Sequence, residues 1–233
     1  MSISLRSAEA RGHPQHGWLD SRHSFSFADY YDPAHMGFRA LRVINEDTIE
    51  GGSGFPTHPH RDMEIVSYVV SGALAHRDTT GGGGTLRRGD IQIMSAGSGV
   101  RHSEFNALPD RKTRFLQIWI LPHAPGLVPA YRQAHISDAE KKNTLRLLVG
   151  SDDHHAGLGI NQDARLYAAL IEPGKSLRHT LSPGRGAWLQ LVDGAITVNG
   201  VAMKAGDGAR IEDVPELAIE ATTDSELLLF DLG

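Results

Sequence analysis

Residues 54–72 read GFPTHPHRDMEIVSYVVSG, and this stretch decides the fold class. Its second half, MEIVSYVV at 63–70, is a short run rich in Val, Ile and Tyr, which is typical of a β-strand. A glycine follows, and GALAHRD at 72–78 then runs back as a second strand, so the stretch predicts a β-hairpin. Similar runs recur to the C-terminus between Gly, Pro, Asn and Asp turns, and this spacing favours a β-sandwich or β-barrel.

Further strands are predicted wherever short apolar or alternating runs occur. They are DIQIM at 90–94, RFLQIWIL at 114–121, LRLLVG at 145–150, RLYAALI at 165–171, AWLQLV at 187–192, AITV at 195–198 and ELLLFDL at 226–232. In the N-terminal third, SFSFADYY at 24–31 alternates Phe with Ser as a half-buried strand does, and a strand in GFRALRVINEDTIE at 37–50 follows it. DDHH at 152–155 is expected to form a solvated turn. The best helix candidate is 135–143, with Ser137 as N-cap.

The two halves of the chain repeat one plan. Residues 54–72 lead through GALAHRD to RRGDIQIM, and residues 174–194 lead through GAITVNG to KAGDGARI. In both halves a strand reaches a Gly turn, a second strand returns, and a Gly-Asp turn begins the next hairpin. The plan predicts an all-β chain of two antiparallel β-barrel (jelly-roll) domains. We place their bounds at 1–134 and 135–233, because strand patterning lapses at that junction.

Composition excludes several classes of function. The chain has 233 residues and a formal charge of −5, and its basic residues are scattered, so nucleic acid is not an expected partner. No run approaches the roughly 20 apolar residues of a membrane helix, and the first residues lack the apolar segment of a secretory signal, so we expect a cytoplasmic protein. Cys is absent, so any metal must be held by nitrogen and oxygen.

Two pairs of residues point to a metal site. In THPH, His58 and His60 are two residues apart, and on a β-strand that spacing directs both imidazoles to one face. RHSE repeats the spacing with His102 and Glu104. Two neighbouring strands would thus bring three imidazoles and one carboxylate to a single point inside the first domain. Such a donor set suits Fe, Mn, Ni, Cu or Zn.

Glu64 is a competing carboxylate, because it follows His60 by four residues and is expected on the same strand face. Glu104 is favoured as the ligand, since its pairing with His102 copies the spacing of His58 and His60. Glu64 is then expected to be structural or to orient a ligand imidazole through its other nitrogen. His76 is the strongest outside candidate. The other histidines are predicted not to bind metal: His13, His16, His23, His35, His123, His135, His154, His155 and His179.

The second half is predicted to lack the metal site. Counted from the paired glycines and the paired Gly-Asp turns, the four candidate ligands correspond in order to Arg178, Thr180, Ile219 and Ala221. These residues offer no imidazole or carboxylate, so the C-terminal domain is expected to be free of metal. His179 falls between two matched positions and is expected to face the opposite way.

Three segments resemble the pirin family of the cupin superfamily. They are HGWLDSRHSFSFADYYDPAHMGFRALRVINEDTIE at 16–50, THPHRDMEIVSYVVSGALAHRD at 57–78 and IQIMSAGSGVRHSEFN at 91–106. The resemblance covers residues 10–122 closely and the C-terminal half through its turn plan. It implies a bicupin whose N-terminal domain binds one metal ion through His58, His60, His102 and Glu104, while a glutamate at the position of Glu64 is not a ligand.

Bacterial pirins of this length are similar to quercetin 2,3-dioxygenases, which open the central ring of a flavonol with O₂ and release carbon monoxide. The resemblance implies one divalent ion, with Fe(II) expected and Zn, Mn, Ni, Co or Cu as alternatives. It also implies a flavonol or related phenol as substrate. Glu104 is the candidate catalytic base for the flavonol 3-hydroxyl. The candidate apolar wall residues are Phe55, Met94, Phe105 and Trp119.

A second hypothesis is a non-catalytic metal or redox sensor that binds a regulatory protein, since some pirins resemble transcriptional cofactors. An open apolar pocket of several hundred Å³ beside the metal would favour an enzyme, whereas a closed metal cavity would favour a sensor. A monomer is expected.

Overall fold

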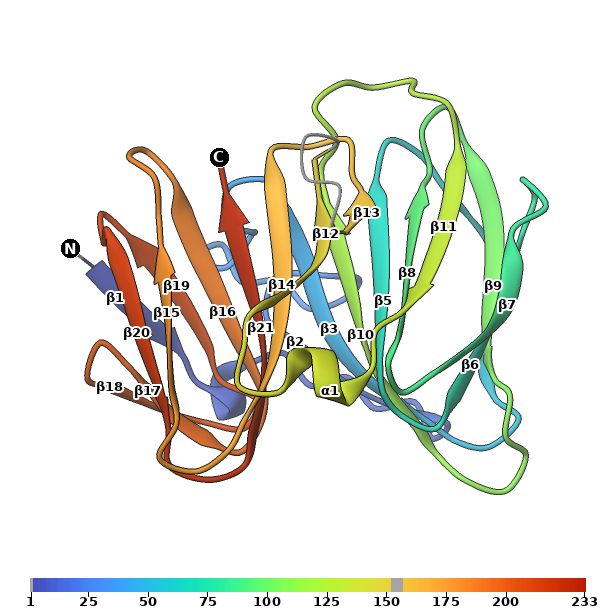
Figure 1. Cartoon of the computed structure of the whole chain (residues 1–233). Helices are drawn as coiled ribbons and strands as arrows, with labels where there is room; N and C mark the ends of the chain where they lie inside the picture. Colours follow the sequence, from blue (N-terminus) through green and yellow to red (C-terminus); the bar gives the residue numbers. More distant parts are fainter. Residues whose placement is uncertain (1, 152–156) are drawn as a thin grey trace. The chain divides into compact units, whose positions relative to one another are not determined.

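The structure is a computed structural model that describes residues 2–151 and 157–233. Its regular elements are almost entirely β-strands (Figure 1), as expected for an all-β chain. The turn predicted at 152–155, with His154 and His155, lies outside the described residues. Within the described ranges, no helix is long and apolar enough to cross a membrane.

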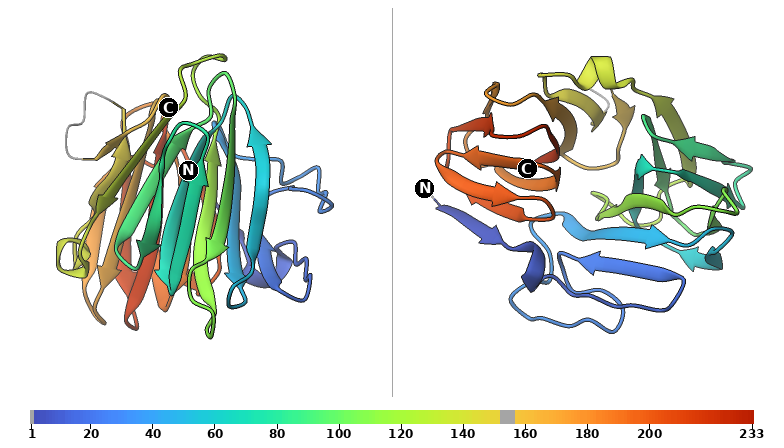
Figure 2. Two further views of the ribbon diagram at one scale, coloured as in Figure 1. Left: turned by 90° about the vertical axis from the view of Figure 1, so that its right-hand side faces the viewer. Right: turned by 90° about the horizontal axis from the view of Figure 1, so that it is seen from below.

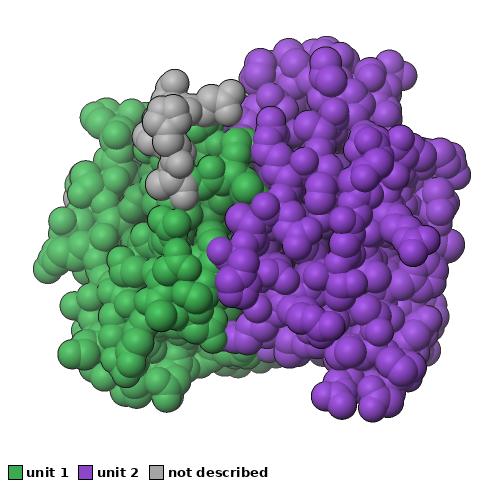
Figure 3. All heavy atoms as spheres, turned by 45° about the vertical axis from the view of Figure 1, so that its right-hand side comes forward, with its two compact units in different colours: residues 1–11, 136–159, 163–233 green, residues 12–135, 160–162 purple. Residues whose placement is uncertain are grey.

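The described part of the chain forms two compact units (Figure 3). The N-terminal unit comprises residues 12–135 and 160–162, and the C-terminal unit comprises residues 1–11, 136–159 and 163–233. The structure places the first strand, β1 (Ser2–Arg6), in the C-terminal unit, whereas the predicted bounds of 1–134 and 135–233 place it in the N-terminal domain. This strand pairs antiparallel with β19 (Gly208–Glu212), and a strand's partner cannot be read from its own sequence.

In the N-terminal unit the described strands form two antiparallel sheets. The larger has the order β11-β8-β5-β10-β3-β2, and the smaller has the order β4-β9-β6-β7. The larger sheet contains β2 (Leu19–His23), β3 (Leu41–Ile49), β5 (Glu64–Ser71), β8 (Asp90–Ser95), β10 (Thr113–Ile120) and β11 (Ala130–His135). The smaller contains β4 (Gly54–His60), β6 (Ala73–Asp78), β7 (Gly83–Arg87) and β9 (Val100–Asn106).

The C-terminal unit repeats this arrangement of a larger and a smaller sheet. Its larger sheet has the order β1-β19-β16-β21-β14-β12-β13, and its smaller sheet has the order β15-β20-β17-β18. The larger sheet adds β12 (Arg146–Gly150), β13 (Leu158–Gly159), β14 (Ala164–Ile171), β16 (Gly186–Asp193) and β21 (Ser225–Leu232). The smaller contains β15 (Ser176–Thr180), β17 (Ala195–Val198), β18 (Val201–Lys204) and β20 (Glu216–Ala221).

The predicted two-domain, all-β class is confirmed, and the sheets are open rather than closed into barrels (Figure 2). The strand predicted at 24–31 is wrong, because this segment is a loop in which Phe27 and Tyr30 form an isolated bridge. Ala28 turns the chain there with a φ of 48°, which an extended strand does not allow.

Among the described residues, the short helical elements are a 3₁₀ turn, η1 (Ala8–Ala10), and α1 (Asp138–Lys141). The helix expected at 135–143 is confirmed, but it is one turn long. Its N-terminus has the predicted Ser137 cap, whose backbone N–H donates to Glu140 Oε2 at 2.9 Å.

The internal repeat is confirmed at the level of individual turns. Gly72 and Gly194 have φ values of 84° and 88°, a conformation that favours glycine. At the next turn, Asp90 and Asp207 each accept a hydrogen bond from the backbone N–H three residues earlier, at 2.7 and 2.9 Å. The same residue types therefore build the same hairpins in both units.

Candidate metal centre

Two adjacent strands of the smaller N-terminal sheet carry the predicted ligands. His58 on β4 lies directly opposite His102 on β9, and His60 follows two residues further along β4. Residues directly opposite each other in an antiparallel pair project to the same side, as do residues two apart on one strand. The register thus brings the three imidazoles together, as the spacing in the sequence predicted.

The three rings converge closely. Their centroids are 4.7 Å apart for His58 and His60, 4.5 Å for His58 and His102, and 4.7 Å for His60 and His102. Nε2 of His58 lies 3.0 Å from Nε2 of His102. Two nitrogens that each lie about 2.1 Å from one ion at a right angle would be about 3.0 Å apart, so the donor set fits a transition metal ion.

The environment lowers the pKa of two of these imidazoles, those of His60 and His102. Burial and the neighbouring His58 lower the pKa of His60 to about 4. Burial, together with the surrounding imidazoles, lowers the pKa of His102 to about 2. Nδ1 of His58 lies 2.8 Å from the carbonyl oxygen of Pro56, so its N–H can donate a hydrogen bond to that oxygen. The lone pair on Nε2 is then free to bind a metal ion. Neutral imidazole is the form that binds metal.

Glu104 is buried beside this cluster. Its Oε1 accepts hydrogen bonds from Ser67 Oγ at 3.0 Å and Gln92 Nε2 at 3.3 Å, and its Oε2 accepts one from Gln117. Burial, together with the nearby Asp47 carboxylate, raises the pKa of Glu104 to about 7 against the opposing effect of these hydrogen bonds. The buried site therefore shifts this carboxyl group toward its protonated form.

The four predicted ligands fall into two overlapping groups. Donor atoms of His58, His60 and His102 all lie within 4.8 Å of one another, and donor atoms of His76, His102 and Glu104 do the same. His102 is common to both groups. The structure thus brings the three predicted imidazoles to one point, with Glu104 next to His102 on the side of His76.

His76 supports His102 from behind. Its Nδ1 lies 3.4 Å from Nδ1 of His102, and its Nε2 lies 3.0 Å from Oδ2 of Asp78, with both side chains fully buried. The ring of Tyr131 stacks on His76 at 5.0 Å. An Asp78–His76–His102 chain directs the proton of His102 to Nδ1 and leaves Nε2 facing His58.

Glu64 is not on the strand face predicted for it, because the chain turns after His60 and Glu64 begins β5 in the other sheet. Its carboxylate instead accepts hydrogen bonds from Ser95 Oγ at 2.9 Å and from the Asn161 side-chain amide at 3.1 Å. These bonds hold residues 160–162 within the N-terminal unit. Glu64 is a structural group.

A cavity of about 350 Å³ lies in the N-terminal unit. It is lined by Pro14, His16, Trp18, Leu19, Ser21, His23, Phe27, Ala28, Asp29, Tyr30, Asn45, Asp47 and Phe55. Two aromatic contacts connect it to the imidazoles, since Trp119 packs edge-on against both Phe27 at 5.2 Å and His60 at 4.9 Å.

Among the candidate wall residues, Phe55 lines this cavity and Trp119 borders it, whereas Met94 packs in the core and Phe105 is 39% exposed. Sequence reasoning missed Asn45 and Asp47. Both are polar residues inside the strand at 37–50, where alternation would have marked them as inward-facing.

The strand registers correct the correspondence between the two halves. His76 opposite Glu104 matches Val198 opposite Ile219, and His58 opposite His102 matches His179 opposite Leu217. The positions equivalent to the predicted ligands His102 and Glu104 are therefore Leu217 and Ile219. Counting along the sequence was wrong because the connections between strands differ in length in the two units.

His179 consequently points inward, contrary to the prediction. Its Nε2 lies 3.0 Å from Oδ2 of Asp231. The other carboxylate oxygen of Asp231, Oδ1, accepts a hydrogen bond from Arg185. Asp231 is 1% exposed, so this contact between the imidazole and the carboxylate is buried. The one imidazole retained in the matched position thus has a carboxylate partner in place of further imidazoles.

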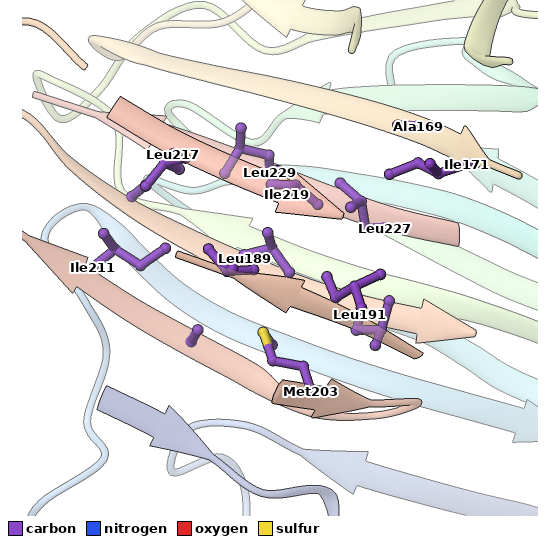
Figure 4. Close-up of a cluster of buried hydrophobic side chains, with 14 of the residues drawn as sticks. Ala169, Ile171, Leu189, Leu191, Met203, Ile211, Leu217, Ile219, Leu227 and Leu229 are labelled. Carbon is purple, nitrogen blue, oxygen red and sulfur yellow. The ribbon is translucent and has the colours of Figure 1, made fainter. Parts of the chain in front are cut away.

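Other matched positions also differ in polarity. Ser67, Gln92 and Gln117 are joined across their sheet, and the matched row in the C-terminal unit is Leu189, Ala209 and Leu229. Leu189, Leu217, Ile219 and Leu229 belong to one buried apolar cluster (Figure 4). The same strands surround a polar interior in one unit and a hydrocarbon interior in the other.

Comparison with known proteins agrees with this arrangement. The pirin family matches residues 4–120, and the quercetinase C-terminal cupin domain matches residues 147–232. Quercetin 2,3-dioxygenase of Escherichia coli K12 is 47% identical over 231 residues, covering 99% of this chain and 98% of that protein. A pirin-like protein of Caulobacter vibrioides is 42% identical over 230 residues, covering 98% of this chain and 99% of that protein.

A solved structure is similar over the same length. The bacterial pirin YhhW of Escherichia coli in complex with nickel(II) has a TM-score of 0.94 and 45% identity, and the match covers 99% of each chain. The pirin match spans the strands that carry the imidazole cluster, and the second match spans the strands around the hydrocarbon interior. The chain belongs to the pirin family.

Proposed function

We propose that this protein is a metal-dependent quercetin 2,3-dioxygenase that opens the central ring of a flavonol with O₂ and releases carbon monoxide. The observation that carries the proposal is the convergence of three imidazoles beside a cavity of about 350 Å³. A curated relative named quercetin 2,3-dioxygenase, 47% identical over nearly the whole chain, supports the reaction.

The ligands that we propose for the metal are His58, His60, His102 and Glu104. The imidazoles supply nitrogen donors and Glu104 supplies a hard oxygen, a combination that accepts most divalent first-row ions. A related pirin has been solved with nickel(II). We propose Fe(II) as the ion of this protein, and metal analysis after native expression would distinguish it from Zn, Mn, Ni, Co or Cu.

When bound, the metal would act as a Lewis acid that lowers the pKa of a phenolic hydroxyl. Glu104 is the group of this chain that takes the proton of the flavonol 3-hydroxyl. Its pKa of about 7 lets it accept and release a proton near neutrality. Gln117 and Ser67 orient the carboxylate through hydrogen bonds. Phe27 and Trp119 provide apolar surface that excludes water near the imidazoles.

The cavity favours an enzyme over a non-catalytic metal or redox sensor. A sensor has no need of an open pocket at its metal, whereas ligand pockets of enzymes usually begin at about 300 Å³. The cavity has about that volume, and aromatic side chains line it.

The test is anaerobic mixing of metal-loaded protein with quercetin, followed by addition of O₂. We expect quercetin to decay with release of one carbon monoxide per turnover, and Glu104→Gln to retain quercetin binding but lose most of the turnover. Absence of turnover in protein that carries one metal ion per chain would contradict the proposal. The cytoplasmic location, the monomeric state and the absence of nucleic-acid binding stay predictions.

A further inference from the structure

The cavity next to the imidazole cluster has two chemically different sides. Trp18, Phe27 and Phe55 provide aromatic surfaces, and Trp18 packs edge-on against Phe55 with ring centroids 5.1 Å apart. Ser21, Asn45 and Asp47 also line the cavity. The lining suits a ligand that has an apolar surface for the aromatic side chains and polar groups for Ser21, Asn45 and Asp47.

The polar side is built by the pairing of β2 with β3. Ser21 lies opposite Asp47 and His23 lies opposite Asn45, so all four side chains project to one face. Ser21 Oγ donates a hydrogen bond to Oδ1 of Asp47. Ser21, Asn45 and Asp47 are 1%, 3% and 4% exposed, so these groups are shielded from bulk water.

Asn45 carries an orphaned acceptor. Its Oδ1 is buried and has no hydrogen-bond partner among the residues that the structure describes. Leaving a buried polar atom unpaired is unfavourable, and native proteins rarely do so without a ligand or water to satisfy it. Asn45 lines the cavity, and a donor on a ligand bound there would satisfy this oxygen.

A second buried atom without a hydrogen-bond partner among the described residues is Nε1 of Trp119, whose ring lies between the cavity residue Phe27 and His60. The site thus offers a donor near the metal cluster and acceptors at Asn45 and Asp47. A flavonol matches this order, because its ketone accepts hydrogen bonds and its outer ring hydroxyls donate them.

We propose that Asn45, with the Ser21–Asp47 pair, recognises the hydroxyl groups on the flavonol ring remote from the metal and so determines substrate specificity. This inference rests on the proposed function for the identity of the substrate. It assigns the preferred substrate class as flavonols with hydroxylated outer rings, over flavonols with only the 3-hydroxyl.

The test compares quercetin with 3-hydroxyflavone, which keeps the 3-hydroxyl and the ketone but lacks all outer hydroxyls. Dissociation constants are measured without O₂ by fluorescence quenching, using metal-loaded wild type, Asn45→Leu and Asp47→Asn with equal metal content. We expect the wild type to bind quercetin about tenfold more tightly than 3-hydroxyflavone, since one or two hydrogen bonds are at stake. In both variants the preference should fall to within about twofold, while binding of 3-hydroxyflavone changes little.

Thr48→Val is the matched control. Thr48 is next to Asp47 on β3 and points to the opposite face of the sheet, so both affinities should stay at wild-type values. The inference is overturned if the wild type binds the two flavonols equally, or if the variants weaken both flavonols by the same factor. Binding is read without turnover, so a protein that discriminates but does not react would contradict the proposed function and leave this inference standing.

Discussion

At the scale of single residues, the imidazole cluster depends on groups that hold each ring. Pro56 orients His58 through its carbonyl oxygen, and the Asp78–His76 pair stands behind His102. A ligand imidazole with a fixed tautomer presents its electron pair without first losing rotational freedom. His76 is thus a positioning residue, and its contribution is separable from that of the ligands.

Replacing His76 tests this role. We expect His76→Leu to weaken metal affinity by about 10- to 100-fold, the range typical for loss of a group that supports a ligand. Competition with a chelator of known affinity measures the change. Arg77→Ala, on the exposed side of the same strand, should have no effect. Unchanged affinity in His76→Leu would show that His102 keeps its orientation without help.

At the scale of elements, the two smaller sheets differ in what their inner faces carry. In the C-terminal unit the inward positions hold Leu217, Ile219 and neighbouring hydrocarbon side chains, so this unit derives its stability from packing. In the N-terminal unit the matched positions hold His102 and Glu104, which need hydrogen-bond partners when buried.

Truncation of the hydrocarbon interior should therefore be costly. Leu229 is fully buried, and Leu229→Ala is expected to lower the free energy of unfolding by about 2–5 kcal/mol through lost contacts and a residual cavity. Arg178→Ala removes only an exposed ion pair with Glu216 and should change it by about 0–1 kcal/mol. Urea denaturation followed by circular dichroism measures both values. Equal values for the two variants would contradict this account of the core.

Asp231 on β21 contacts His179 on β15, and its carboxyl group should make the free energy of unfolding depend on pH. Burial raises the pKa of this carboxyl, but the hydrogen bonds from His179 and Arg185 outweigh burial, and the pKa lies below its ordinary value of 3.8. Because the folded-state pKa is lowered, the ionised form stabilises the fold above about pH 4, and this contribution is lost as the pH falls through the folded-state pKa.

The variant Asp231→Asn should lower the free energy of unfolding at pH 7 by about 1–3 kcal/mol. It should also flatten the decline in stability below pH 4. Unfolding is followed from pH 7 to pH 2, with Asp224→Asn, an exposed carboxylate, as the control. A decline as steep as that of the wild type would mean that other carboxyl groups govern acid stability.

At the scale of the whole molecule, we expect metal binding and folding to be linked, because the proposed ligands come together only in the folded N-terminal unit. Adding metal at about 100 times the dissociation constant should stabilise that unit by about 2.7 kcal/mol, and chelation should reverse the gain. In His102→Ala the melting should stay cooperative but become independent of metal. Differential scanning calorimetry and elemental analysis measure the two effects, with His135→Ala, an exposed histidine, as control. One metal ion per chain in His102→Ala would refute its assignment as a ligand.

The all-β class, the repeated hairpins and the cluster of His58, His60 and His102 could be predicted from the sequence. These features depend on local rules: a period of two along a strand, glycine at turns, and residues two apart on one face. The same rules identified Ser137 as a helix cap.

Features that depend on which strands pair, and in which register, became visible in the folded structure. The structure pairs β1 with β19 and places the Glu64 carboxylate within hydrogen-bonding distance of Ser95 and Asn161. It shows that His179 occupies the position equivalent to His58. It also gathered Asn45 and Asp47 into the cavity. Strand pairing connects residues far apart in the chain, and loops of unequal length shift the correspondence between repeats, so counting along the sequence cannot recover these contacts.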